Sequence, residues 1–247
     1  MTLPLFLYIT ITWFLAGVLT GLTSFGANLF AIPLLTLVMP AQDAILLGCM
    51  SATAVYLSLG LLYCRAAHWA EICVLGLTSL LGVPLGVSFL NQAGPRLLLL
   101  GAGCCLVLFL LWQFLAAFLH RTEVPVSRWW CVPLGALSGV MMGAAGMGGP
   151  PFVIYAFLRH WSKESTICGT TLSSSFSLLA LLPAQWAAGL YTAPLLKAAL
   201  LGALFGILGI AASVYIIHKV NARLFRRLLL GMLALSAAML LVRGCLA

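Results

Sequence analysis

The sequence has 247 residues, of which 64% are apolar and only 6% are charged, and its formal net charge is +8. Soluble domains carry about a quarter charged residues, so this composition excludes a nucleic-acid-binding module, a secreted disulfide scaffold and an enzyme with a water-soluble catalytic domain. An excess of Lys and Arg over acids is typical of the cytoplasmic loops of a membrane protein.

Long apolar segments follow one another along the chain, each bounded by polar or basic residues. A helix needs about 20 residues to cross the hydrocarbon core once. Two segments, 4–39 and 129–158, are too long for one crossing and are interrupted by small residues. Six others fit a single crossing, at 44–63, 71–90, 97–119, 165–189, 197–217 and 223–243. We therefore expect an all-α polytopic membrane protein with eight long apolar segments.

Clusters of small residues interrupt both of the longer segments. They read GLTSFGAN at 21–28 and GAAGMGGPP at 143–151. Glycine costs a helix roughly 1 kcal/mol relative to alanine, so each cluster predicts unwound backbone followed by a short return helix, at 29–39 and at 150–158. Each broken segment is then a helix hairpin, and counting the return helices gives about ten crossings.

The two breaks occupy equivalent places in two halves of the chain. Gly17 and Pro33 match Gly135 and Pro151 at one constant offset of 118 residues. This predicts an internal repeat in which each unit has one broken hairpin and three full spans. The expected division is a first repeat at 1–120, a connecting loop at 121–128 and a second repeat at 129–247.

The basic residues indicate how the two repeats are oriented. If each broken segment enters the membrane and returns, nine Lys and Arg lie on one side and only Arg96, Lys197 and Arg243 on the other. A single crossing by each broken segment gives a poorer division of seven to five. The sharper division favours an odd number of crossings in each half, and hence inverted repeats. Both termini are then expected on the outer side of the membrane.

Unwound backbone at membrane depth indicates a central binding site, because it is tolerated only inside protein or beside a wet cavity. The start of each return helix presents unpaired N–H groups and the positive end of the helix dipole, which suit an anion. The eight cysteines show no metal-binding spacing with histidine, and no cofactor, metal or catalytic residue is expected. The expected substrate-binding residues are Ser24, Asn28, Gly146, Gly148, Gly149, Thr53, Thr170, Thr171, Ser174 and Gln185.

These residue types also have structural interpretations, which stay open here. Small residues spaced like Gly17 and Gly21 are typical of close helix packing. Serine and threonine can donate to carbonyls of their own helix. Cys49 and Cys168, close to the predicted site, fit either small apolar packing or transient thiol contacts with a sulfur-containing substrate.

The two broken segments also carry a family resemblance. The second reads GALSGVMMGAAGMGGPPFVIY from Gly135 to Tyr155, and the first, more loosely, GVLTGLTSFGANLFAIPLL from Gly17 to Leu35. This pattern, extended over both halves, resembles the TauE/SafE sulfite exporter family. The resemblance implies a bacterial inner-membrane carrier for sulfite, sulfonates or related sulfur-containing anions. The first break departs from the family's usual three glycines.

We therefore expect a transporter, not an enzyme, that exports a small sulfur-containing anion such as sulfite, thiosulfate or an organosulfonate. The alternatives are a carrier or channel for another small anion, a cation or a neutral metabolite, with or without thiol participation. An intramembrane serine hydrolase at Ser138 lacks a histidine base within a span. The expected partners are the anion and the lipid bilayer, without nucleic acid, and a homodimer is left open. Carboxylates and histidines fall only at predicted loop edges, so we expect the membrane potential rather than proton symport to drive export.

Overall fold

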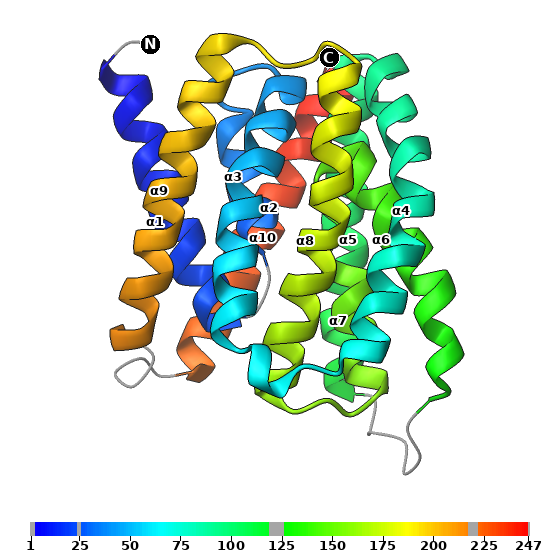
Figure 1. The fold of residues 1–247 in the computed structure, drawn as a ribbon. Helices are drawn as coiled ribbons and strands as arrows, with labels where there is room; N and C mark the ends of the chain where they lie inside the picture. The colour runs from blue at the N-terminus through cyan, green and yellow to red at the C-terminus, as the bar shows by residue number, and fades with distance from the viewer. Residues whose placement is uncertain (1–2, 24–25, 119–125, 217–221, 247) are drawn as a thin grey trace.

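A computed structural model describes residues 3–23, 26–118, 126–216 and 222–246, and within these ranges the secondary structure is entirely helical (Figure 1). The α-helices are α1 (Leu3–Thr23), α2 (Ala27–Leu35), α3 (Ala41–Leu62), α4 (Trp69–Gln92), α5 (Pro95–Phe118), α6 (Cys131–Ala145), α7 (Gly149–Leu158), α8 (Lys163–Ala187), α9 (Ala193–Ile216) and α10 (Ala222–Leu246). Two short 3-10 helices, η1 (Cys64–Ala66) and η2 (Arg128–Trp130), precede α4 and α6.

The six segments predicted to cross once each form one long helix, and both longer segments are divided in two. The breaks are shorter than the sequence predicts, because α1 continues to Thr23 and α6 to Ala145. The first return helix is also displaced: it begins at Ala27 and ends at Leu35, instead of spanning 29–39. Glycines inside a predicted break therefore stay helical where packing rewards their small size.

Five helices of the described chain are long and apolar enough to cross a membrane: Pro4–Thr23, Ala41–Leu62, Trp69–Gln92, Lys163–Ala187 and Ala193–Ser213. The return helices α2 and α7 have nine and ten residues. At 1.5 Å per residue each covers only about 15 Å, half of the hydrocarbon core. The chain is thus an all-helical protein of the polytopic membrane type, while eight spans and inverted repeats stay predictions.

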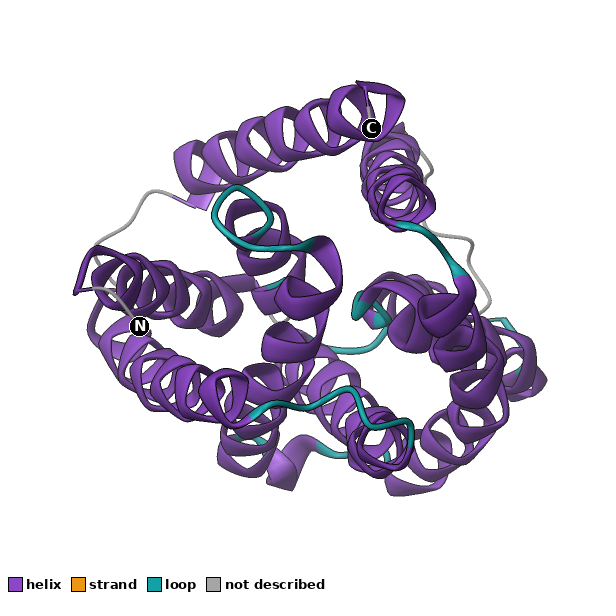
Figure 2. Cartoon of the chain, turned by 90° about the horizontal axis from the view of Figure 1, so that it is seen from above, coloured by secondary structure: helices purple, strands orange, loops and turns teal. Residues whose placement is uncertain are grey.

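Helices from opposite halves of the chain form the most extensive contacts, first α4 with α6 and then α1 with α9. Other pairings join α5 to α10, α3 to both α8 and α9, and α4 to α8. Figure 2 looks along the bundle. There the helix that ends at the C-terminal label, α10, lies at the edge of the bundle and is strongly tilted from the viewing direction. Figure 1 shows that α1 begins and α10 ends at the same end of the bundle.

Glycines make the two largest helix contacts possible. A Cβ added to Gly139 of α6 would lie 1.9 Å from the Ser79 carbonyl oxygen of α4, and one added to Gly17 of α1 would lie 2.0 Å from the Gly206 carbonyl oxygen of α9. Only glycine allows backbones to approach so closely. The predicted packing role of these glycines is confirmed, and it positions the two helices that lead into the breaks.

Candidate functional site

The two breaks meet inside the bundle. Asn28, in the first turn of α2 and only 1% exposed, donates from Nδ2 to the carbonyl oxygen of Gly146 at 2.6 Å. Positions 28 and 146 are separated by the same 118 residues that relate the two predicted repeats. Each break turns at a glycine with left-handed backbone, Gly26 at φ 106° and Gly146 at φ 69°. Sequence positions predicted to be equivalent are therefore in direct contact.

Two further side chains lie against this contact, and the four residues Asn28, Cys49, Gly146 and Gln185 are called the break cluster. A Cβ added to Gly146 would lie 3.0 Å from Cys49 Sγ on α3. The side-chain amide of Gln185 on α8 interacts with the same thiol. Cys49 and Gln185 are both fully buried, so the cluster joins α2, α3, α8 and the break after α6.

Two polar atoms of the break cluster are buried without a hydrogen-bond partner among the described residues: Asn28 Oδ1 and Gln185 Nε2. A buried polar group without a partner costs about 1–3 kcal/mol. Such atoms are expected where a ligand or water completes the site. The unpartnered Nε2 group is a donor, as an anion oxygen requires, whereas Asn28 uses its nitrogen to join the two breaks.

Tyr56 on α3 closes the first break from the side. Its hydroxyl lies near the backbone at the start of α2, from Gly26 to Asn28, and its side chain is 5% exposed. The hydroxyl is therefore beside the helix end whose N–H groups and dipole suit an anion. Sequence reasoning missed Tyr56, because an aromatic residue inside an apolar helix carries no local sign of such a contact.

Four of the predicted hydroxyl residues lie on α3 or α8, and the described hydrogen bonds of the three threonines among them stay within their own helix. Thr53 donates to the Cys49 carbonyl at 2.8 Å, Thr170 to that of Thr166 at 2.7 Å, and Thr171 to that of Ile167 at 2.6 Å. Ser174 is buried on α8 at 3% exposure. These bonds match the structural alternative for serine and threonine.

The remaining predicted residues belong to the breaks themselves. Ser24 lies outside the described residues. Gly148 precedes α7 and Gly149 is its first residue. Ser138 of α6 donates to the carbonyl of Gly148, so its hydroxyl braces the second break.

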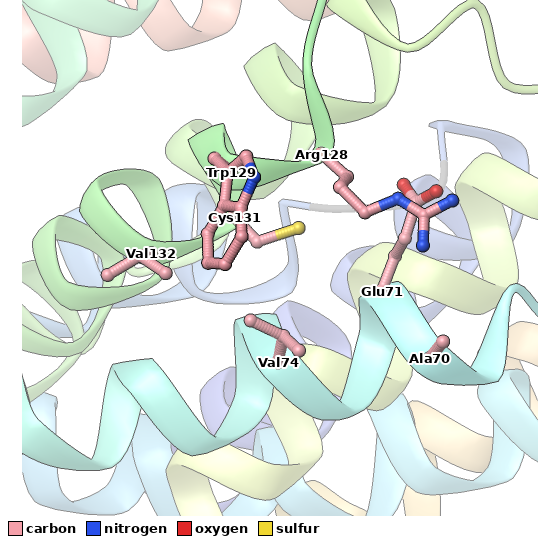
Figure 3. A pocket seen from close by; sticks show the side chains of 7 residues that line it. All are labelled: Ala70, Glu71, Val74, Arg128, Trp129, Cys131 and Val132. Atoms are coloured by element: carbon pink, nitrogen blue, oxygen red, sulfur yellow. The ribbon is translucent and has the colours of Figure 1, made fainter.

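A cavity of about 190 Å³ lies away from the break cluster, beside the first turns of α4 and α6 (Figure 3). Figure 3 shows Arg128 extending toward Glu71. The Glu71 carboxylate accepts from Arg159 at 2.8 Å and from the Tyr155 hydroxyl. The hydrogen bonds between Arg159 and Glu71 raise the pKa of the Arg159 guanidinium, which therefore stays charged. The lining residues are Ala70, Glu71, Val74, Arg128, Trp129, Cys131 and Val132.

This cavity suits an anion poorly. Its walls are apolar apart from the Arg128 guanidinium and the Glu71 carboxylate, which Arg159 already neutralises, so an anion would find little hydrogen bonding there. The break cluster instead presents an uncharged donor in a fully buried position. Among the described residues, no group of three His, Cys, Asp or Glu side chains is placed to hold a metal ion.

The comparisons with known proteins identify the family of this chain. The family model for the sulfite exporter TauE/SafE matches residues 9–240. No curated protein and no solved structure matches the chain. The matched range contains both breaks and the whole break cluster. With nearly its full length covered, the chain is a multi-pass membrane transporter that belongs to the sulfite exporter TauE/SafE family.

Proposed function

We propose that this protein exports a small sulfur-containing anion, such as sulfite, thiosulfate or an organosulfonate, across the bacterial inner membrane. Membership of the family makes it a transporter of the sulfite-exporter type. The observation that carries the proposal further is the contact between the two breaks, with a fully buried and unpartnered amide donor beside it. Transport without covalent chemistry needs no catalytic residue, and the proposal includes none.

The proposal includes two inverted repeats, 1–120 and 129–247, joined by the loop at 121–128. The two repeats would make α1 the counterpart of α6, α3 that of α8 and α4 that of α9. When each helix in a main contact is replaced by its counterpart, the result is again a contact that is observed. The pair α1 and α9 becomes α6 and α4, and the pair α3 and α9 becomes α8 and α4. Such reciprocity supports a two-fold relation between the halves. Three full spans in each half and periplasmic termini are further parts of the proposal.

In this proposal the anion binds where the two breaks meet. The Nε2 group of Gln185 and the N–H groups at the start of α2 donate to its oxygens. The glycines of the second break let the anion approach the backbone closely. An uncharged site releases an anion as readily as it binds one. The other proposed lining residues are Ser24, Asn28, Gly146, Gly148, Gly149, Thr53, Thr170, Thr171 and Ser174.

The membrane potential is the proposed driving force. The described carboxylates lie in the first turns of long helices, Asp43 in α3, Glu71 in α4 and Glu164 in α8. The break cluster contains no carboxylate or histidine to carry a coupled proton. A negative interior drives an anion outward with about 2.3 kcal/mol per charge per 100 mV, which is enough for export without symport.

Flux measurements on purified protein in proteoliposomes test the proposal. The panel is sulfite, thiosulfate, methanesulfonate, acetate and neutral glycerol, each at fixed potential with and without a pH gradient. We expect saturable flux of at least one sulfur anion that follows the potential, and a strong reduction in Asn28→Ala. Equal glycerol flux contradicts an anion carrier, and strict dependence on the pH gradient contradicts potential-driven export.

Thiol participation is a second candidate, favoured by the place of Cys49 in the break cluster. Cys168 lies elsewhere, buried in a separate apolar cluster with Tyr155 and Trp161. Comparing the sulfite and thiosulfate flux of Cys49→Ala with that of Cys168→Ala separates chemistry from packing. Selective loss of thiosulfate flux in Cys49→Ala supports participation of the thiol, whereas unchanged flux assigns Cys49 to packing.

A further inference from the structure

A tyrosine that follows α8 forms a hydrogen bond with the Gln185 amide of the break cluster. Tyr191 lies between α8 and α9, and its hydroxyl donates to Gln185 Oε1 at 2.6 Å. Its ring packs beside Trp186, with 6.0 Å between the ring centroids. Burial raises the pKa of the Tyr191 phenol, so the hydroxyl keeps its proton and remains a donor.

This bond decides which end of the Gln185 amide is free. A side-chain amide has one acceptor end and one donor end. Tyr191 occupies the acceptor end, Oε1, and the donor end, Nε2, is left without a partner although Gln185 is fully buried. After rotation of the amide by half a turn, Nε2 would donate to the phenol oxygen, but the phenol proton and Oε1 would both need other partners, which a buried site disfavours.

The Gln185 amide also lies close to the junction of the two breaks. Its neighbour there is the Cys49 thiol, and Cys49 Sγ lies 3.0 Å from the place where a Cβ on Gly146 would stand. Nε2 forms no hydrogen bond with this thiol or with any other described group, so the unpartnered donor lies beside the junction.

We infer that Tyr191 is a positioning residue, which fixes the Gln185 amide so that Nε2 donates to an oxygen of the transported anion. The inference rests on the proposed function and assigns a polarity to its site. A donor fixed in this way selects an oxyanion that has a free acceptor oxygen. A solute that offers only hydrogen-bond donors cannot form a hydrogen bond with Nε2.

Tyr191→Phe tests the inference, because phenylalanine keeps the ring beside Trp186 and removes only the hydroxyl. Without its partner, the Gln185 amide loses its fixed orientation. We expect the KM for sulfite efflux from proteoliposomes to rise about fivefold, the value of one neutral hydrogen bond, with the maximal rate within about twofold of the parent.

A double-mutant cycle separates positioning from a direct or purely structural role of Tyr191. Gln185→Leu removes the donor, and we expect its KM to rise about tenfold or more. If Tyr191 acts through Gln185, adding Tyr191→Phe to Gln185→Leu raises the KM no further. Tyr8→Phe is the matched control, since the Tyr8 hydroxyl donates to the Leu34 carbonyl at 2.8 Å, at the far end of α2. It should leave the KM unchanged.

The outcomes are decisive in either direction. An equal rise in KM with and without Gln185 overturns the positioning role, as does a Tyr191→Phe variant that transports like the parent. Gln185→Glu, which replaces the free donor by an acceptor, should bind sulfite more weakly than Gln185→Leu, and the reverse order also overturns the inference. If the parent protein itself gives no saturable sulfite, thiosulfate or methanesulfonate flux, the proposed function fails instead.

Discussion

The two breaks occupy equivalent positions in the chain but supply different groups. The first turns at Gly26, where no heavy atom of the described residues lies within 4 Å of an added Cβ, and the Asn28 side chain reaches across to the other break. The second turns at Gly146, crowded by Cys49 and Ile32, and offers a backbone carbonyl. The lesson is that matched halves need not be interchangeable at the place where they meet.

The return helices also differ in what holds their ends. Arg159, which ends α7, forms an ion pair with Glu71 of α4 and donates to the Val126 carbonyl at 2.8 Å. At the end of α2, the carbonyl of Thr36 accepts a hydrogen bond from Arg243 of α10. A charge pair therefore holds one return helix, and a charge on a carbonyl holds the other.

The largest expected effect comes from the helix contacts that lead into the breaks. Gly139→Ala and Gly17→Ala each drive a methyl group into a carbonyl oxygen across the contact, at 1.9 Å and 2.0 Å. The two backbones must then move apart, and the closest contact between the helices is lost. We therefore expect each variant to lose more than about 3 kcal/mol of stability. Thermal unfolding in detergent, with size-exclusion chromatography, measures this loss.

Gly231→Ala is the matched control for both variants, because an added Cβ there meets no atom of the described part of the chain within 4 Å. Alanine at that position should be neutral or slightly stabilising in a helix. If Gly139→Ala unfolds at the temperature of Gly231→Ala, the close approach of α4 and α6 is wrong.

The next largest effect separates the two breaks directly. Gly146→Ala adds left-handed strain and a contact of 3.0 Å with both Cys49 and Ile32, whereas Gly26→Ala adds the strain alone. Left-handed backbone costs alanine about 1–2 kcal/mol, so we expect a loss of about 1 kcal/mol at Gly26 and about 3 kcal/mol at Gly146. Chemical unfolding of both variants checks the difference, and equal losses would contradict the crowding of the second break.

The anchors of the return helices give a smaller effect. Arg159→Gln removes the ion pair of the partly buried Glu71 carboxylate, which keeps the hydrogen bond from the Tyr155 hydroxyl and the nearby Arg128, and we expect a loss of about 2 kcal/mol. Arg243→Gln removes one charged donor from a carbonyl and should cost about 1 kcal/mol. Melting temperatures measured at low and high salt test both, because only the ion pair should weaken with salt. The opposite order would mean that α2 is held more firmly than α7.

Sequence alone predicts the long helices and the existence of both breaks, because apolar length and glycine clusters act locally. It misplaces the limits of the breaks. Gly21 and Gly143 stay helical because a Cβ on either would clash with a neighbouring helix, so close packing repays their weak helix propensity. This gain in packing depends on the partner helix, and the local sequence pattern does not show which helix that is.

The candidate site is predictable only in part, for the same reason. Asn28 and Gln185 stand out as polar residues in apolar segments, and both lie in the break cluster. Tyr56 and Tyr191 are not predicted from the sequence, because the groups that their hydroxyls contact come near them only in the folded chain. Donors and acceptors inside a bundle are paired by tertiary contacts, so their roles become visible only with the helices in place.

The smallest expected effect distinguishes one more equivalent pair, Ser138 and Thr20, again 118 residues apart. The Ser138 hydroxyl crosses to the Gly148 carbonyl and braces the second break, whereas the Thr20 hydroxyl donates to Ala16 in its own helix. Ser138→Ala should therefore cost about 1 kcal/mol, and Thr20→Val at most a few tenths, because the helix already satisfies that carbonyl. Unfolding curves for the two variants measure the difference. Sulfite flux that survives in Ser138→Ala also argues against a hydrolase at this serine, since a nucleophile cannot be replaced by a methyl group.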